Sequence, residues 1–176
     1  MESDGVIREY LQMISYGTKL AGALVDRAYS SMEHFVLDNG EYFESPEYPL
    51  PARFRGEPKM CYSNSFDMLV GYGMSCPKAV DAIYCEGYAY TEGLIPLPHA
   101  WLLSKDGEVL ETTWDHAGDE YYGVAFDSGF VRDTLLSKGS YGVIDNVEER
   151  WPLLAGIDES VWKYDKNQPT TLRRLC

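Results

Sequence analysis

Three residue types that act together in nucleophilic catalysis occur in order along this chain. Cys61 supplies a thiol, His99 an imidazole and Glu111 a carboxylate. A carboxylate that accepts a hydrogen bond from one ring nitrogen fixes the histidine tautomer, which leaves the other nitrogen free to take the thiol proton. The thiolate that results is the nucleophilic form of cysteine. These residues therefore predict a cysteine nucleophile, a histidine base and an acid that orients it.

A predicted β-hairpin brings the histidine and the acid together. Strand-forming residues flank Asp106-Gly107, a pair that is typical of tight hairpin turns. Side chains alternate along a strand, so Glu111 and Asp115 lie on one face of the returning strand. The register of a hairpin depends on its turn. Either carboxylate, Glu111 or Asp115, can therefore lie beside His99.

A predicted helix over residues 60–72 carries Cys61 in its first turn. There the unpaired backbone N–H groups and the helix dipole stabilise a thiolate and can donate to an oxyanion. Basic residues that precede this turn add positive potential: Arg53, Arg55 and Lys59. Asn64 on this helix and Trp101 on the strand of His99 are candidates for contact with the substrate or the oxyanion. The alternative is that Cys61 is a buried core residue without chemistry.

Other predicted elements surround this pair. Apolar residues at helical spacing predict two helices over about residues 4–38, with a break near Gly17. Aromatic and β-branched residues predict strands at 82–90 and 121–126. Helical patterns recur over about residues 127–165. With the hairpin, these elements predict an α+β fold in which the cysteine helix packs on an antiparallel sheet.

Length and charge limit the class of protein. A chain of 176 residues is long enough for one domain with a sizeable core, and we expect residues 1–176 to form one. The net charge of −13 argues against direct nucleic-acid binding, because phosphates are repelled. No apolar run approaches the roughly 20 residues of a membrane helix, and no secretory signal opens the sequence. A cytoplasmic location without membrane attachment is therefore expected.

The cysteines show no pattern of a metal or redox site. Cys61, Cys76, Cys85 and Cys176 include no Cys-x-x-Cys pair, and no cysteine–histidine spacing suits zinc. In a cytoplasmic chain they are predicted to be free thiols. Cys85 falls in the middle of a predicted strand, where we expect a core residue. The sequence predicts neither a metal nor a cofactor.

The order of these elements resembles the core of transglutaminase-like and, more broadly, papain-like cysteine enzymes. The resemblance covers about residues 58–126: a helix headed by cysteine, a strand with Gly-Tyr, a strand that opens with His-Ala-Trp, and an acid before Thr-Thr-Trp. It implies a papain-like core to which the N-terminal helices are additions. It also implies a triad of Cys61, His99 and Glu111, although the transglutaminase-like group usually has aspartate at the third position.

The resemblance implies a cysteine-dependent hydrolase or acyl transferase that acts on an amide, ester or isopeptide bond through a thioester. The substrate would be a protein, a peptide or a small amide, and the sequence does not distinguish water from an amine as the acceptor. Two other functions stay open. One is an acidic, non-catalytic inhibitor that binds a basic protein as a DNA mimic, in the manner of phage anti-defence proteins. The other is a superfamily member without turnover.

Overall fold

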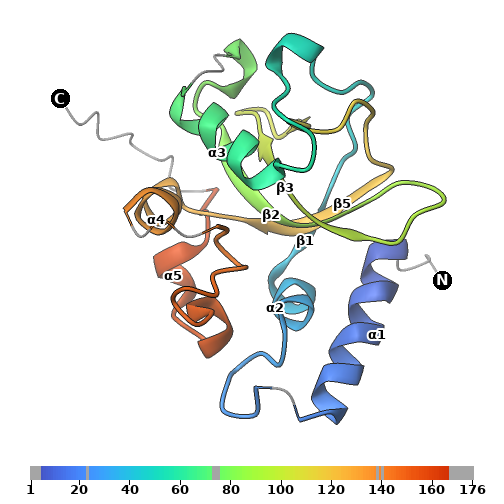
Figure 1. The fold of residues 1–176 in the computed structure, drawn as a ribbon, viewed down its shortest axis with the longest axis vertical. Helices are drawn as coiled ribbons and strands as arrows, with labels where there is room; N and C mark the ends of the chain where they lie inside the picture. The colour runs from blue at the N-terminus through green and yellow to red at the C-terminus, as the bar shows by residue number, and fades with distance from the viewer. Residues whose placement is uncertain (1–4, 23, 73–75, 138, 140, 167–176) are drawn as a thin grey trace.

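The computed structural model describes residues 5–22, 24–72, 76–137, 139 and 141–166. Figure 1 shows a curved sheet with helices around it. The sheet is antiparallel and has five strands in the order β1-β5-β2-β3-β4. Its strands are β1 (Glu41–Phe43), β2 (Ile83–Tyr90), β3 (Leu97–Leu103), β4 (Val109–Leu110) and β5 (Glu120–Ala125). The helices are α1 (Val6–Leu20), α2 (Met32–Asn39), α3 (Cys61–Val70), α4 (Ser128–Arg132) and α5 (Glu159–Trp162).

The two faces of the sheet are packed differently. The face that carries Tyr84, Tyr88 and Leu102 packs against the helices and forms the larger core cluster. The opposite face carries a smaller cluster that includes Cys85 and Trp101. In Figure 1, α3 lies beside β3 at one end of the sheet, and α1 and α2 lie at the end formed by β1 and β5. The predicted α+β architecture is thus confirmed.

Helix α3 matches the predicted helix closely. It begins at Cys61 and ends before Gly71, whose φ of +73° is a left-handed conformation that glycine tolerates. Met68 and Ser65 face the core, and the helix contacts β2 and β3. The prediction that the cysteine helix packs on an antiparallel sheet is confirmed.

The middle of the sheet contains a close approach between β2 and β5. Gly87 pairs with Gly123 on one side and with His99 of β3 on the other. A methyl group at Gly87 would lie 2.3 Å from the carbonyl oxygen of Tyr122. The absence of a side chain at Gly87 therefore allows the two strands to meet at the position that also carries His99.

The N-terminal helices differ from the prediction in their boundaries. Helix α1 continues through Gly17, so the predicted break there is wrong. The chain leaves the helical path farther on, where Gly22 and Leu24 adopt positive φ values of 67° and 50°. Helix α2 follows only after these turns, and the Ser31 hydroxyl caps its first turn.

The C-terminal region contains less helix than predicted. Asp127 caps α4 by accepting hydrogen bonds from two backbone amides, but the helix is only 5 residues long. The sequence predicts a further helix over 147–154, and this is wrong. Arg150 and Trp151 adopt positive φ values of 58° and 50° before a 3-10 turn that begins at Pro152. None of the helices in the described part of the chain has the length and apolar character needed to cross a bilayer.

Candidate active site

The predicted hairpin is present but shorter than expected. Gly107 has a φ of +84° in its turn, and β3 pairs with β4 over only the 2 residues of β4. Glu111 lies just beyond β4, so the prediction that it belongs to a long returning strand is wrong. Its carboxylate accepts hydrogen bonds from the backbone amides of Thr113 and Trp114 at 2.8 and 2.9 Å. The chain therefore turns around this carboxylate instead of continuing along β3.

His99 lies between Cys61 and Glu111 and interacts with both. His99 Nε2 lies 2.9 Å from Glu111 Oε2. Cys61 also interacts with the ring and helps to raise its pKa, and both residues line one cavity. Because Glu111 occupies Nε2, Nδ1 is the ring nitrogen that is open to the thiol. All of these residues are buried, with Cys61 the most exposed at 8%. The structure thus brings together the thiol, imidazole and carboxylate that the sequence singled out.

The Glu111 carboxylate is held by several donors. In addition to His99 and two backbone amides, the Tyr121 hydroxyl donates to Oε2 at 2.7 Å. Asp115, the other candidate acid, is exposed, and its Oδ1 lies 2.9 Å from Nδ1 of His116. The acid in contact with His99 is therefore Glu111.

Burial and charge act in opposite directions on this pair. Burial lowers the pKa of His99, but the Glu111 charge and the hydrogen bonds to Glu111 and Cys61 outweigh it and raise that pKa to about 9. Burial likewise opposes ionisation of Glu111, yet the His99 charge and the hydrogen bonds to the carboxylate lower its pKa overall. The raised pKa of His99 and the lowered pKa of Glu111 both favour an imidazolium–carboxylate pair.

Hydrogen bonds fix α3 to the segment that follows β4. The Asn64 side chain donates to Thr113 Oγ1 at 2.9 Å and to the Glu57 carbonyl at 2.8 Å. The hydroxyls of Ser65 and Thr112 lie 2.8 Å apart. These contacts set the distance between the helix that carries the thiol and the turn that carries the acid.

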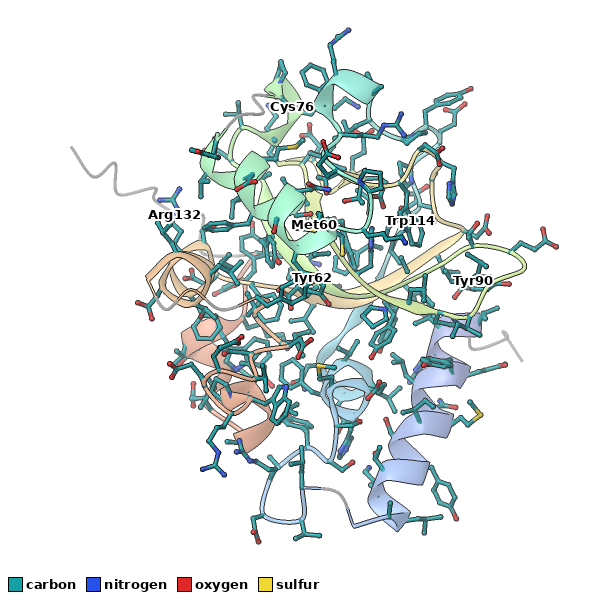
Figure 2. All side chains as sticks on the ribbon, in the orientation of Figure 1. Met60, Tyr62, Cys76, Tyr90, Trp114 and Arg132 are labelled. Carbon is teal, nitrogen blue, oxygen red and sulfur yellow. The ribbon has the colours of Figure 1, made fainter. Side chains whose placement is uncertain are left out.

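A cavity of about 640 Å³ reaches the cysteine and the histidine. Figure 2 shows Met60 and Tyr62, which flank Cys61, at the start of α3 with Trp114 nearby. The described residues that line the cavity are Pro58, Lys59, Cys61, Tyr62, Leu97, Pro98, His99, Thr113, Trp114, Asp115, Tyr141 and Asp145. Cys61 and His99 therefore open onto a space that can hold a ligand.

The tryptophan beside the histidine is Trp114. Its ring stacks on His99 with centroids 4.5 Å apart, and it lines the cavity. Trp101 is fully buried against Tyr121 on the sheet face away from the helices. Neither Trp101 nor the buried Asn64 is among the described lining residues. The sequence favoured a core position for both tryptophans and offered only Trp101 as a contact, because only the turn around the carboxylate places Trp114 on the ring.

Tyr141 and Asp145 are lining residues that no sequence pattern indicated. They belong to an irregular segment that follows α4 and has neither helical nor strand periodicity. Glu86 of β2 brings the segment to the cavity, because its carboxylate accepts hydrogen bonds from the Val143 and Ile144 amides. Such a long-range contact leaves no local signal in the sequence.

The other described cysteines lie apart from this site. Cys76 and Cys85 are buried free thiols, and burial raises the pKa of Cys85 well above its usual range. Cys176 lies outside the described residues. Among the described residues, no group of three or more His, Cys, Asp or Glu side chains could hold a metal ion.

Comparison of the chain with protein-family models, curated proteins and solved structures finds no match. A functional interpretation of the site therefore depends on its own residues and their geometry.

Proposed function

We propose that this protein is a cysteine-dependent hydrolase or acyl transferase with a papain-like, transglutaminase-like core. The observation that carries the proposal is that His99 is hydrogen-bonded to the buried Glu111 and lines the same cavity as Cys61, with which it interacts. Burial of an imidazolium and a carboxylate costs free energy through desolvation. The same arrangement supplies a nucleophile, a base and an orienting acid, which is the requirement of covalent acyl transfer.

In the proposed acylation step, Cys61 Sγ attacks the carbonyl carbon of an amide or ester as a thiolate, whose proton is already held on Nδ1 of the His99 imidazolium. Backbone N–H groups in the first turn of α3 donate to the tetrahedral oxyanion. The carbonyl then re-forms as the bond to the leaving amine or alcohol breaks, and the imidazolium gives its proton to that leaving group. The enzyme-bound product is a thioester.

Release of the acyl group uses the same residues with a new acceptor. His99 takes a proton from water or from an amine, whose oxygen or nitrogen attacks the thioester carbonyl. The carbon–sulfur bond then breaks, and Cys61 leaves as the thiolate beside the His99 imidazolium, which restores the starting state. Water gives hydrolysis and an amine gives acyl transfer. Glu111 stays ionised throughout and stabilises the imidazolium.

The proposal predicts that Cys61 is far more reactive than another thiol of equal exposure. We would add limiting iodoacetamide near neutral pH and quantify the alkylation of each cysteine by peptide mass spectrometry. Cys76 is the matched control, because the exposed fraction of this residue is 6%, close to the 8% of Cys61. Cys61 should react at least about tenfold faster, since the adjacent imidazole stabilises its thiolate.

Variants separate this proposal from the other two functions. Cys61→Ala should abolish fast labelling and Cys85→Ala should leave it intact, whereas equal labelling of the two variants would contradict the proposal. Binding to a basic protein that survives Cys61→Ala and His99→Ala, and weakens steeply with salt, would instead support an acidic inhibitor. Fast labelling of Cys61 without turnover of amide, ester or isopeptide substrates would indicate an inactive member of the superfamily.

A further inference from the structure

An irregular segment, residues 141–146, forms the part of the cavity wall that lies beside α3. Glu86 of β2 binds this segment to the centre of the sheet. Its carboxylate accepts hydrogen bonds from the backbone amides of Val143 and Ile144 at 2.6 and 2.7 Å. Glu86 is only 1% exposed. A buried carboxylate is costly unless its oxygens are hydrogen-bonded. The segment therefore supplies the donors that Glu86 needs, and Glu86 fixes the segment in return.

The far end of the segment is held as well. The Trp151 amide donates to the Asn146 carbonyl at 2.7 Å, and the Trp151 indole donates to Asp145 Oδ1 at 3.3 Å. Trp151 and Arg150 adopt positive φ values of 50° and 58°, which cost free energy for residues other than glycine. The Arg27 guanidinium donates to the Trp151 carbonyl at 3.0 Å and secures this turn. Asp145 is thus presented to the cavity by a wall that is fixed at both ends.

The groups that this wall presents are aromatic and anionic. Tyr141 and Asp145 line the cavity, and the Tyr141 ring packs on Tyr62 with centroids 4.9 Å apart. Tyr62 follows Cys61 directly in α3, and Tyr141 is 52% exposed. Faces of tyrosine rings attract cations, and a carboxylate forms charge-assisted hydrogen bonds with ammonium or guanidinium groups. The chemistry of this wall therefore favours a cation.

Three other described lining residues carry charge, and none reverses this preference. The charge of the His99 imidazolium is balanced by the Glu111 carboxylate 2.9 Å away. Lys59 is exposed and carries one positive charge, while Asp115 is exposed and lies within ion-pair distance of His116. The hydrogen-bond partner described for Asp145 is the neutral indole of Trp151. Asp145 therefore keeps its charge available for a ligand.

We propose, on the basis of the cysteine-enzyme function above, that Tyr62, Tyr141 and Asp145 form a subsite for the basic side chain of a lysine or arginine in a peptide substrate. The aliphatic part of that side chain packs on the tyrosine rings, and its cationic end pairs with Asp145. This places the basic residue next to the carbonyl that Cys61 attacks. The net charge of −13 adds a longer-range attraction for such a substrate.

The test uses acyloxymethyl ketone probes that alkylate an active-site cysteine and differ only in the side chain beside the ketone. We would compare N-acetyl-lysine, N-acetyl-norleucine and N-acetyl-glutamate probes on the full chain and measure the rate of mass gain at Cys61. The lysine probe should react about tenfold faster than the norleucine probe, and the glutamate probe should be slowest. The ratio of lysine to norleucine rates within one protein cancels differences in the reactivity of the thiol itself.

Variants locate the preference. Asp145→Asn, which keeps an acceptor for the Trp151 indole, should reduce the ratio to about 2 or less, and Asp145→Glu should restore most of it. Asp115→Asn makes the same charge change elsewhere on the cavity and should leave the ratio above about 5. Equal reduction by Asp115→Asn and Asp145→Asn would overturn the subsite in favour of general electrostatic attraction.

The result with iodoacetamide distinguishes the two proposals. If Cys61 reacts rapidly with iodoacetamide but all three ketone probes react equally, or if the glutamate probe is preferred, the subsite is wrong and the cysteine-enzyme function stands. If Cys61 reacts with iodoacetamide no faster than Cys76, the proposed function fails and the subsite fails with it.

Discussion

At His99 the balance between burial and a neighbouring charge is set by one carboxylate. Glu111→Gln keeps the size of the side chain and removes its charge. Burial then lowers the pKa of the His99 ring without the carboxylate charge that raises it. We expect the pKa of His99 to fall from about 9, as measured by NMR titration of the labelled imidazole. The variant should also lose about 2 to 4 kcal/mol of unfolding free energy, because one partner of a buried ion pair is gone. Asp115→Asn is the matched control, and an equal fall in the pKa of His99 there would contradict the assignment of Glu111.

The same residue gives stability a defined dependence on pH. The pKa of His99 is raised from 6.5 to about 9 in the folded protein, so its stabilising contribution is complete below about pH 6.5 and is lost as the pH rises through 9. We expect urea unfolding to show a loss on the order of 3 kcal/mol over this range. The pKa of Glu111 is lowered by folding, so this group affects stability at acidic pH. Its stabilising contribution is lost only as the pH falls through its folded pKa. In His99→Gln the decrease in unfolding free energy between neutral and alkaline pH should largely disappear.

Between elements, a small set of hydrogen bonds places the nucleophile near the acid. Asn64→Ala removes the bonds from α3 to Thr113 and to Glu57. Thr113 is buried and would lose this partner, whereas Glu57 is exposed to water, so we expect a loss of about 1 to 2 kcal/mol in unfolding free energy. Alkylation of Cys61 should also slow, because the helix start is no longer fixed against the histidine. Ser63→Ala in the same turn should change stability by less than about 0.5 kcal/mol, and a similar effect of both variants would argue against this positioning role.

The attachment of segment 141–146 to β2 also depends on pH. Burial raises the pKa of Glu86 to about 7, because it outweighs the hydrogen bonds to the carboxylate, which lower the pKa. A raised pKa means that the folded state binds the proton more tightly, so stability is greatest below about pH 4.5 for this group and falls as the pH rises through 7. The change is on the order of 3 kcal/mol. In Glu86→Gln the unfolding free energy should no longer change with pH between about pH 5 and 7. The decrease at alkaline pH that arises from His99 should remain. If the unfolding free energy of the variant still fell between about pH 5 and 7 as in the unmodified protein, the raised pKa of Glu86 would be refuted.

At the scale of the molecule, the curved sheet requires strands that approach closely at its centre. A side chain at Gly87 would meet the backbone of β5 at 2.3 Å, and backbone cannot move aside as a flexible side chain can. Gly87→Ala should therefore cost more than about 3 kcal/mol in thermal or urea unfolding. Gly17→Ala is the control, because nothing lies within 4 Å of a methyl group there. In the interior of α1 that change should stabilise the protein by about 0.5 to 1 kcal/mol, and comparable effects at the two glycines would contradict this account.

The local features of the site could be predicted from the sequence because they depend on neighbouring residues. Apolar spacing placed Cys61 at the start of a helix that ends at a glycine. The Asp106-Gly107 turn made a hairpin that begins near His99. The extent of the returning strand was mispredicted, because strand propensity does not reveal that the Glu111 carboxylate will accept hydrogen bonds from the amides two and three residues on and bend the chain.

The sequence by itself determined which residues could form the nucleophile and the base, and which kinds of element would carry them, because periodicity, capping and turn chemistry act over a few residues. Only the tertiary structure decided that Glu111, and not Asp115, meets His99, since this depends on where β4 ends. It also decided that Tyr141 and Asp145 line the cavity. That placement depends on hydrogen bonds that Glu86 accepts from the amides of Val143 and Ile144, which lie 57 and 58 positions further along the chain. A contact over such a sequence separation has no local signature.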